Sequence, residues 1–459
     1  MVLEMAADGL GERRAVGDLT FADVRTAARG VASRLRSTDP PVTTLASLLP
    51  NGDHMPVALF GACWAGVSYA PLNFRLPEPA QAELLARLEP AARFDDSWMH
   101  GAHDGEPFVD EPSRPAVLLF TSGTSAAPKA AVLHHDNLAA YLFNTLEFGS
   151  ASAEEAALIA VPPFHIAGVA AVLSSTYVGR RIVPMARFDA EDWLELAAAE
   201  SVTHAFVVPT MLARIIATLE ADPGLRPPAL RSLAYGGARM PRPVIERALE
   251  LLPDVDFVNA YGLTETASTV AVLGPDDHRV AVASDDPAVR RRLESCGRAV
   301  PGVEFRIADG EVWIRGDQVG GGYVGTDSQV DADGWLHTGD QGFLDDEGYL
   351  VVVGRGDEVI IRGGENISPA EIEDTLLRHP GVAAAAVVGL PDVEWGETVA
   401  AMVVADGSLD PAALQEWARP QLGSIKTPEI VVVADELPQT PTGKVLRREV
   451  RDQLRSQPG

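Results

Sequence analysis

The stretch AFVVPTMLARIIATLEA, residues 205–221, joins a short apolar run to a helical pattern through Pro209. The run 205–208 has the composition of a buried strand, and proline is well tolerated in the first turn of a helix. The same succession continues on both sides, with strand-like runs at 158–161, 233–235 and 255–258 and a helical pattern at 241–252. This alternation predicts an α/β fold whose strands are largely buried.

The pattern changes from Val303 onward, where short strand-like runs are separated by Asp-Gly and Glu-Gly pairs. Such pairs favour tight turns, so this part is expected to form antiparallel hairpins. After Arg355 the chain resets to a compact α+β pattern, with helices expected at 369–381 and 409–422 and strands at 383–390, 399–405 and 429–437. A unit of about 100 residues can form its own core. The sequence therefore predicts a large N-terminal multi-sheet α/β domain, residues 1–356, and a small C-terminal α+β domain, residues 357–459, with the boundary near Asp357.

Composition limits the class of protein. The chain has 459 residues, too many for one core, and 46% hydrophobic with 22% charged residues is typical of a soluble globular protein. A formal net charge of −28 argues against nucleic acid or anionic membranes as partners. We expect no membrane span and a cytoplasmic location, because no run of about 18 apolar residues and no apolar signal core occur. Cys63 and Cys296 have no metal-ligand spacing and are expected to be core or near-core thiols.

Lysine is scarce in this chain. Of 37 basic residues only Lys129, Lys426 and Lys444 are lysines. A lysine kept against this bias is a candidate for a site that needs a compact point charge with three donors.

The stretch FTSGTSAAPKAAVLHH, residues 120–135, follows an apolar run and carries four hydroxyl side chains before Lys129. Small and hydroxylated residues between a strand and a lysine are typical of a phosphate-binding loop, although the spacing of a Walker loop is absent. Such loops usually depend on glycine, and this one keeps only Gly123. A working loop, a weakened one and an ordinary turn all remain open on these residues alone.

Six further motifs follow in order along the chain: VPPFHIAG at 161–168, YGGARMP at 235–241, NAYGLTE at 259–265, GWLHTGD at 334–340, GRGDEVIIRGGENISPAEIE at 354–373 and LPQTPTGKVLR at 437–447. Together with the loop they resemble the adenylate-forming superfamily, specifically its acyl-CoA synthetases, over about residues 20–448. The resemblance implies a large N-terminal domain and a small, mobile C-terminal one. It also implies a two-step reaction, in which a carboxylate attacks the α-phosphate of ATP to give acyl-AMP and a thiolate, usually of coenzyme A, then displaces AMP.

The resemblance assigns roles to individual residues. For the β- and γ-phosphates of ATP it implies a cradle of Thr121, Ser122, Gly123, Thr124, Ser125 and Lys129. For the rest of the nucleotide it implies Thr264 at the α-phosphate, Glu265 as the Mg²⁺ ligand, Tyr261 stacked on adenine, Gly237, Ala238 and Asn259 along the adenine edge, and Asp340 and Arg355 at the ribose. For the two half-reactions it implies Lys444 as the adenylation lysine, His165 as a gate between the nucleotide and acyl pockets, Asp357 as the hinge, and Gly363, Gly364 and Glu365 in the loop facing coenzyme A. Lys426 matches a family lysine whose role stays open.

Two departures from the family pattern concern the phosphate loop, where Ala126 and Ala130 replace the usual glycines. If either position needs a positive φ, its Cβ costs on the order of 1–2 kcal/mol or shifts the loop. The damage would be confined to adenylation, because the second half-reaction handles AMP alone. The loop at 354–369 looks intact.

The sequence therefore predicts an acyl-CoA synthetase acting on a largely apolar carboxylic acid. One alternative is a member specialised in thiolation, which would convert preformed acyl-AMP and coenzyme A and would imply a partner adenylating enzyme. A freestanding module that loads a carrier protein is disfavoured, because a −28 surface repels acidic carriers. The cluster Arg447, Arg448, Arg451 and Arg455 is interpreted either as a contact for the phosphates of coenzyme A or as a solvated helix face. A non-catalytic nucleotide-binding regulator is disfavoured because Glu265, Asp340 and Lys444 are retained.

Overall fold

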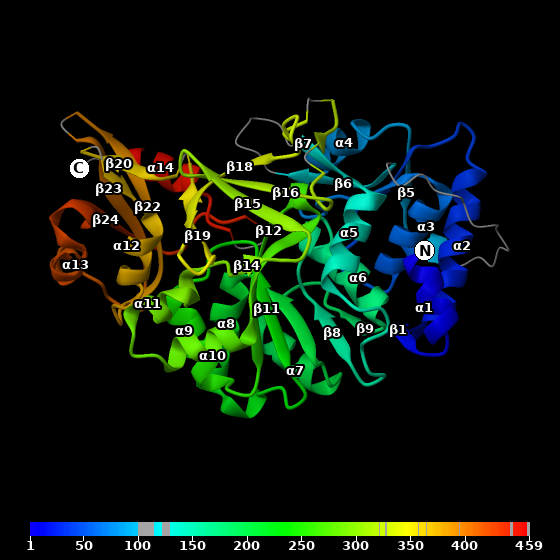
Figure 1. The fold of residues 1–459 in the computed structure, drawn as a ribbon, viewed down its shortest axis with the longest axis horizontal. Coiled ribbons are helices and arrows are strands. Elements are labelled where there is room, and N and C mark those ends of the chain that lie inside the picture. The colour runs from blue at the N-terminus through cyan, green and yellow to red at the C-terminus, as the bar shows by residue number, and fades with distance from the viewer. Residues whose placement is uncertain are drawn as a thin grey trace.

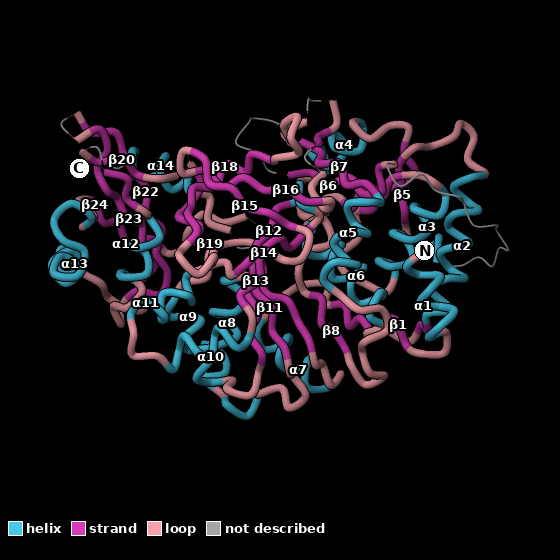
Figure 2. Tube along the Cα trace, in the orientation of Figure 1, coloured by secondary structure: helices cyan, strands magenta, loops and turns pink. Residues whose placement is uncertain are grey.

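The structure is a computed structural model that describes residues 1–99, 114–121, 129–320, 322–325, 328–356, 358–363, 365–393, 395–440 and 444–456. The molecule is elongated, with the N-terminal helices at one end and the orange and red C-terminal elements at the other (Figure 1). Strands run through the middle of the large domain and helices cover them (Figure 2). None of the helices in the described ranges is long and apolar enough to cross a bilayer.

The largest sheet carries the strand-to-helix units that the sequence predicts. In the described residues its order is β14 (Arg298–Ala299), β13 (Ser268–Leu273), β12 (Asp256–Leu263), β11 (Ser232–Gly236), β10 (His204–Val207), β8 (Ala156–Ile159), β9 (Arg181–Pro184), β1 (Arg14–Val16) and β2 (Leu19–Thr20). Strand β10 pairs in parallel with both β8 and β11, and β11 pairs in parallel with β12. The helices that follow these strands are α6 (Ile166–Val178), α7 (Ala190–Ala199), α8 (Pro209–Ala221) and α9 (Arg242–Leu251). The α/β prediction is therefore confirmed.

One strand ends earlier than the sequence pattern indicates. The run 158–161 was expected to be a strand, but β8 stops at Ile159. The amide of the buried Asn51 donates to the carbonyl oxygens of Ile159 and Val161, at 3.1 and 3.0 Å. A side chain far away in the sequence thus hydrogen-bonds the backbone just beyond the strand, while the Ile159 carbonyl oxygen also accepts from the Met185 amide at 2.9 Å.

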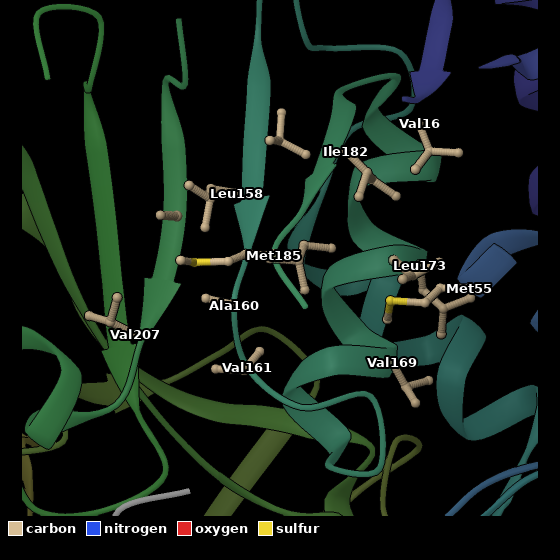
Figure 3. Packing of buried hydrophobic residues seen from close by; sticks show 14 of the residues in the cluster. Val16, Met55, Leu158, Ala160, Val161, Val169, Leu173, Ile182, Met185 and Val207 are labelled. Atoms are coloured by element: carbon tan, nitrogen blue, oxygen red, sulfur yellow. The ribbon is translucent and has the colours of Figure 1, made fainter. Parts of the chain in front are cut away.

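The core of the large domain lies between this sheet and the helices beside it. Figure 3 shows Leu158 and Ile182 of the sheet together with Val169 and Leu173 of α6 and Met55 of α3 (His54–Ala65). All of these side chains are buried. The other helical segments of the large domain are α1 (Val2–Leu10), α2 (Phe21–Arg36), α4 (Glu78–Ala86), η1 (Asp96–Met99), α5 (His135–Thr145), η2 (Pro223–Leu225), η3 (Thr264–Thr266), α10 (Pro275–Ala283), α11 (Pro287–Arg290) and η4 (Arg291–Glu294).

A second sheet holds the strands on either side of the predicted phosphate loop. Its order in the described residues is β17 (Gly322–Tyr323), β7 (Lys129–His134), β6 (Pro115–Thr121), β4 (Ser68–Pro71), β3 (Thr44–Ser47) and β5 (Ala91–Phe94). Strands β6 and β7 are antiparallel, with Thr121 opposite Lys129 and Phe120 opposite Ala130. The two ends of the loop therefore start from adjacent positions on one sheet.

The hairpins expected after Val303 form a separate antiparallel sheet of β15 (Val303–Ala308), β16 (Glu311–Gly316), β18 (Leu336–Leu344) and β19 (Leu350–Arg355). Its turns use the residues that the sequence marked. Asp309 and Gly310 have φ of 51° and 79°, the left-handed conformation that a tight hairpin turn favours. Before Tyr349, Gly348 has φ of 81° and the Asp345 side chain accepts from the Tyr349 amide at 2.8 Å.

The C-terminal unit has its own sheet and core. In the described residues the sheet consists of β21 (Glu365–Ile367), β20 (Ile360–Arg362), β23 (Gly396–Ala405), β22 (Val382–Asp392) and β24 (Ile430–Ala434). The helices that pack around it are α12 (Pro369–Leu376), α13 (Pro411–Lys426) and α14 (Arg447–Ser456). Two buried apolar clusters, one on each side of the central strands β22 and β23, stabilise this unit. The predicted helix at 369–381 is shorter than expected, since α12 ends at Leu376. The boundary residue Asp357 lies outside the described residues, so the division 1–356 and 357–459 stays a prediction.

Candidate active site

A pocket of about 350 Å³ lies where the C-terminal ends of β11 and β12 face the small domain. The large domain lines it with segment 236–241, segment 259–263, Asp340 and segment 352–355. The small domain contributes Pro369, Ala370 and residues near 384 and 444. Polar and charged groups from distant parts of the chain meet here beside apolar walls, as is typical of a small-molecule site.

Asp340 is the charged centre of this pocket. It lies on β18 directly opposite Arg355 on β19, and the Arg355 Nε is 3.0 Å from the Asp340 Oδ1. The Tyr261 hydroxyl donates to the Asp340 Oδ2 at 2.6 Å. Burial raises the pKa of the Asp340 carboxyl, and the charge of Arg355 and the hydrogen bond from Tyr261 lower it again in part. Strand register therefore brings Asp340 and Arg355 together, and Tyr261 reaches them from β12 of the largest sheet.

The ends of β11 and β12 approach each other closely at the bottom of the pocket. A Cβ on Gly236 would lie 2.2 Å from the Ala260 carbonyl oxygen, and Gly237 has φ of 80°. Both positions therefore require glycine. Gly237, Ala238 and Asn259 line the pocket as predicted, and the Asn259 amide donates to the Ser295 carbonyl oxygen at 2.9 Å.

Lys444 lines the same pocket from the small domain. It precedes α14, and its backbone amide donates to the Thr440 hydroxyl at 3.0 Å. Its charge is one of the influences that lower the pKa of Asp340. The structure thus brings the predicted adenylation lysine to the predicted nucleoside site.

Thr121, Lys129 and Glu265 are not among the residues that line this pocket. All three lie close to Tyr323. The Tyr323 hydroxyl donates to the Glu265 Oε1, and the Lys129 Nζ lies 5.9 Å from the centre of the Tyr323 ring. Burial and then the Glu265 charge raise the pKa of Tyr323. Glu265 belongs to η3, which begins at Thr264 directly after β12. The residues around Tyr323 therefore follow directly, along the chain, from the strand that carries Tyr261. Sequence reasoning missed Tyr323, because no motif marks it.

The structure corrects one expectation about the phosphate loop. Ala130 was expected to bear a strained backbone if a positive φ were required there. Instead it lies in β7 opposite Phe120, with extended backbone and only 4% of its surface exposed. A residue with a Cβ fits a paired strand without strain, so Ala130 does not weaken the loop by this mechanism. Ser122, Gly123, Thr124, Ser125 and Ala126 lie outside the described residues.

His165, the predicted gate, is not among the residues that line the pocket in the described part of the chain. It is the N-cap of α6, with its ring centre 4.9 Å from that of Phe164. Burial, with the nearby charge of Arg75, lowers the pKa of His165 to about 4. The imidazole is therefore neutral at physiological pH.

The predicted loop facing coenzyme A lies on the small domain. Gly363 has φ of 60°, and its amide donates to the Trp395 carbonyl oxygen at 2.8 Å. Glu365 is exposed on β21, while Gly364 lies outside the described residues. Lys426 is held by both oxygens of Glu371, at 2.8 and 2.7 Å.

Arg447 does not belong to a solvated cationic face. Its Nη2 donates to the Glu373 Oε2 at 2.9 Å, its Nη1 donates to the Val387 carbonyl oxygen at 2.7 Å, and Glu358 lies 3.4 Å from its Nε. These partners raise the pKa of Arg447 despite its burial. Arg447 is therefore engaged by carboxylates of the small domain, which contradicts a solvated face for this residue. The interpretation of the cluster as a contact for the phosphates of coenzyme A stays a prediction.

The donor set fits a nucleotide and one metal ion. A buried carboxylate beside an arginine and a tyrosine can accept ribose hydroxyls, and Lys129 and Lys444 can face phosphates. No group of three or more metal-ligating side chains occurs in the ranges that the structure describes. A single carboxylate such as Glu265 suits Mg²⁺, which usually binds one or two carboxylates together with substrate phosphates and water.

Family models match both parts of the chain. The AMP-binding enzyme model matches residues 95–324, and the model of the AMP-binding enzyme C-terminal domain matches residues 371–444. The small domain was thus correctly recognised as a separate unit of the fold.

Individual relatives are similar over almost the whole length. Feruloyl-CoA synthase of Amycolatopsis sp is 36% identical over 94% of this chain and 93% of its own. Fatty acid–[acyl-carrier-protein] ligase ScoC of Streptomyces coeruleorubidus is 32% identical over 95% and 92%. The solved structure of o-succinylbenzoate CoA synthetase of Bacillus subtilis, in complex with its acyl-adenylate intermediate, has a TM-score of 0.84 at 28% identity and covers 98% of both chains. The chain belongs to the AMP-binding enzyme family of acyl- and aryl-CoA ligases, and it is an AMP-forming acid–thiol ligase.

Proposed function

We propose that this enzyme is an acyl-CoA synthetase that joins a largely apolar carboxylic acid to coenzyme A through an acyl-adenylate. The observation that carries the proposal is the meeting of Tyr261, Asp340 and Arg355 of the large domain with Lys444 of the small domain at one pocket. In the first half-reaction a carboxylate oxygen bonds to the α-phosphorus of ATP and pyrophosphate leaves. In the second, a thiolate sulfur bonds to the acyl carbon and AMP leaves.

The large domain binds the nucleotide. Tyr261 stacks on adenine, and Gly237, Ala238 and Asn259 lie along the edge of the adenine ring. Asp340 accepts hydrogen bonds from the two ribose hydroxyls and Arg355 orients it, because their ion pair fixes the carboxylate plane. Since AMP is bound in both half-reactions, these residues serve both.

The residues that would hold the phosphates and the metal ion include Lys129 and Glu265, which lie beside Tyr323. Lys129, Thr121 and the hydroxyl residues Ser122, Thr124 and Ser125 hold the β- and γ-phosphates with the amide of Gly123, and Thr264 donates to the α-phosphate. Glu265 holds Mg²⁺, which supplies positive charge to the phosphates when bound. Lys444 donates to the reacting carboxylate and the α-phosphate, where charge develops in the transition state.

The acid is largely apolar because the walls of the pocket are apolar. Ala213, Met240 and Val244 of the large domain are among the residues that line it. The relatives named for ferulate, fatty acids and 2-succinylbenzoate agree with such a pocket. Aryl, alicyclic and fatty acids all meet this requirement.

The second half-reaction uses another face of the small domain. Gly363, Gly364 and Glu365 then line the path of the pantetheine thiol, after the domain 357–459 rotates on Asp357 relative to the domain 1–356. His165 is neutral at physiological pH and does not line this pocket in the described part of the chain, so its role as a gate between the nucleotide and the acyl group stays a prediction.

Half-reactions measured separately test this function. A panel of aryl, alicyclic and fatty acids is tested for exchange of labelled pyrophosphate into ATP, and the acyl-AMP of each active acid is tested for thioester formation with coenzyme A or with a phosphopantetheinylated carrier protein. We expect exchange with at least one acid and transfer of its acyl group to coenzyme A. Transfer from acyl-AMP without exchange for the same acid would identify a thiolation specialist. A carrier protein that outcompetes coenzyme A, or the absence of both half-reactions across the panel, would refute the proposal.

A further inference from the structure

An ion pair joins the two domains beside the pocket. Arg239, in the loop between β11 and α9 of the large domain, pairs through its Nη2 with the Asp374 Oδ2 on α12 of the small domain. Its Nη1 also donates to the Ala370 carbonyl oxygen, one turn earlier on α12, at 3.3 Å. One guanidinium therefore contacts both a side chain and the backbone of α12, which fixes the orientation of this helix relative to the large domain as well as its distance.

The pair is largely shielded from water. The Asp374 side chain is 7% exposed and the Arg239 side chain 27%. The other carboxylate oxygen of Asp374, Oδ1, is buried without a hydrogen-bond partner. Loss of Arg239 would leave this carboxylate buried and unpaired as long as the domains keep this orientation, so that the orientation itself becomes unfavourable.

Helix α12 connects this ion pair to Lys444. Glu373, the neighbour of Asp374, accepts hydrogen bonds from Arg447, and Arg447 follows Lys444 by three residues. The Glu373 Oε1 also accepts from the Val387 amide at 2.8 Å, which ties the same carboxylate to β22. An unbroken series of contacts thus runs from Arg239 through Asp374, Glu373 and Arg447 to the backbone that carries Lys444.

We propose that Arg239 is a positioning residue for adenylation: its contact with α12 holds the small domain in the orientation that brings Lys444 to the nucleotide. Arg239 does not contact the reacting atoms and acts through Asp374. This role rests on the proposed two-step function, because it assigns the observed orientation to the first half-reaction. For the second half-reaction the small domain must leave this orientation, and the Arg239–Asp374 pair then separates.

The test replaces Arg239 with Met and measures the two half-reactions separately. We expect exchange of pyrophosphate into ATP to fall about tenfold, while thioester formation from synthetic acyl-AMP and coenzyme A changes less than about twofold. Asp374→Asn should act in the same direction from the other side of the junction. Arg239→Lys keeps the charge but not the two-pronged contact, so it should recover part of the exchange activity. In a Lys444→Ala background, Arg239→Met should cause no further loss of exchange, since its effect passes through Lys444.

Arg242→Met is the matched control. Arg242 lies three residues after Arg239 and pairs with Glu246 and Glu294 at 3.0 and 3.2 Å, all within the large domain. The Arg242→Met variant removes the same charge near the same pocket but leaves the Arg239–Asp374 contact intact. The ratio of the rates of the two half-reactions should therefore stay that of the wild type. An equal loss of both half-reactions in folded Arg239→Met, or the same change of ratio in Arg242→Met, would overturn the proposal.

Amide hydrogen exchange keeps the proposal testable without the acid. In the presence of AMP, Arg239→Met should raise amide hydrogen exchange in segments 237–241 and 444–447, whose residues line the same pocket from the two domains. Arg242→Met should not raise it at 444–447. Unchanged exchange at both segments would contradict the positioning role. A wild type that performs neither half-reaction with any acid would instead refute the proposed function, and the exchange experiment would still decide whether Arg239 holds the domains together.

Discussion

The two ends of the nucleotide site are built differently. At the nucleoside end, Asp340 and Arg355 lie opposite each other on the paired strands β18 and β19, so register places the carboxylate and the guanidinium side by side. Tyr261 joins them from β12 of the largest sheet. At the phosphate end, Thr121, Lys129 and Tyr323 come from β6, β7 and β17 of one sheet, while Glu265 follows β12 of another. The charged pair of the nucleoside end is therefore fixed by the pairing of two neighbouring strands, whereas the Tyr323–Glu265 contact of the phosphate end exists only because two sheets meet.

The difference also separates the half-reactions. AMP is present in both steps, but the β- and γ-phosphates are present only in the first. Substitutions at the nucleoside end should therefore impair both steps, and those at the phosphate end only adenylation. The following substitutions test this division, in order of decreasing expected effect.

Glu265→Gln should have the largest effect. Removal of the charge that holds Mg²⁺ should lower pyrophosphate exchange by about 100-fold or more, the scale for lost electrostatic stabilisation of a transition state. AMP binding, measured by calorimetry, should stay within about twofold of the wild type, since AMP alone needs no metal ion. Equal loss of exchange and of AMP affinity in a folded variant would show that Glu265 is not the metal ligand.

Asp340→Asn should impair both half-reactions by a similar factor. A hydrogen bond to a charged group contributes about 1.5–3 kcal/mol, which corresponds to a loss of about tenfold or more in each step. The variant also leaves Arg355 without its ion-pair partner, so thermal unfolding should be followed alongside the kinetics. A defect confined to adenylation would break the division between the two ends.

Tyr323→Phe should have a smaller effect, confined to adenylation. It removes the hydrogen bond to Glu265 but keeps the ring beside Lys129. Because Glu265 keeps its charge and only loses one of the groups that orient it, pyrophosphate exchange should change by about fivefold or less, which is about 1 kcal/mol, mainly through the Mg²⁺ concentration that gives half-maximal rate. A matched loss in thioester formation from acyl-AMP would place Tyr323 outside the phosphate end.

Ala130→Gly should give no gain in adenylation. The position is a paired, buried strand residue, so glycine there should only cost about 0.5–1 kcal/mol of stability, seen as a lower unfolding midpoint. Ala126→Gly is the informative partner. If the loop is weakened, the single change at 126 should recover as much exchange as the double change. A gain in pyrophosphate exchange from Ala130→Gly alone would contradict the conclusion that Ala130 is an unstrained strand residue.

The fold was predictable where its cause is local. The strand-to-helix units around Pro209 and the Asp-Gly hairpins follow from residues that are neighbours in sequence, and both are found. The end of β8 was not predictable, because it is decided by Asn51, more than 100 residues away.

The same rule separates the site residues that the sequence marks from those that it does not. Motifs identify Tyr261, Asp340 and Lys444, and these residues do line one pocket. Tyr323 lies in no motif, and Arg239 lies in YGGARMP without an assigned role, since their contacts with Glu265 and Asp374 join residues far apart in the sequence. Asp374 in particular has the pattern of an ordinary acid on a helix surface, yet it is buried and pairs with Arg239 of the other domain.

The close approach at Gly236 limits how this enzyme can change its substrate. A Cβ there would lie 2.2 Å from the Ala260 carbonyl oxygen, which belongs to a neighbouring strand and cannot move aside as a side chain could. Selection for a new acid, in nature or in a library, therefore has little freedom at the floor of the pocket. Variation should accumulate on α8 and α9, at positions such as Thr210, Ala213 and Val244, where side chains alone shape the wall. Libraries that keep position 236 fixed and randomise those helices would search the part of sequence space that remains foldable.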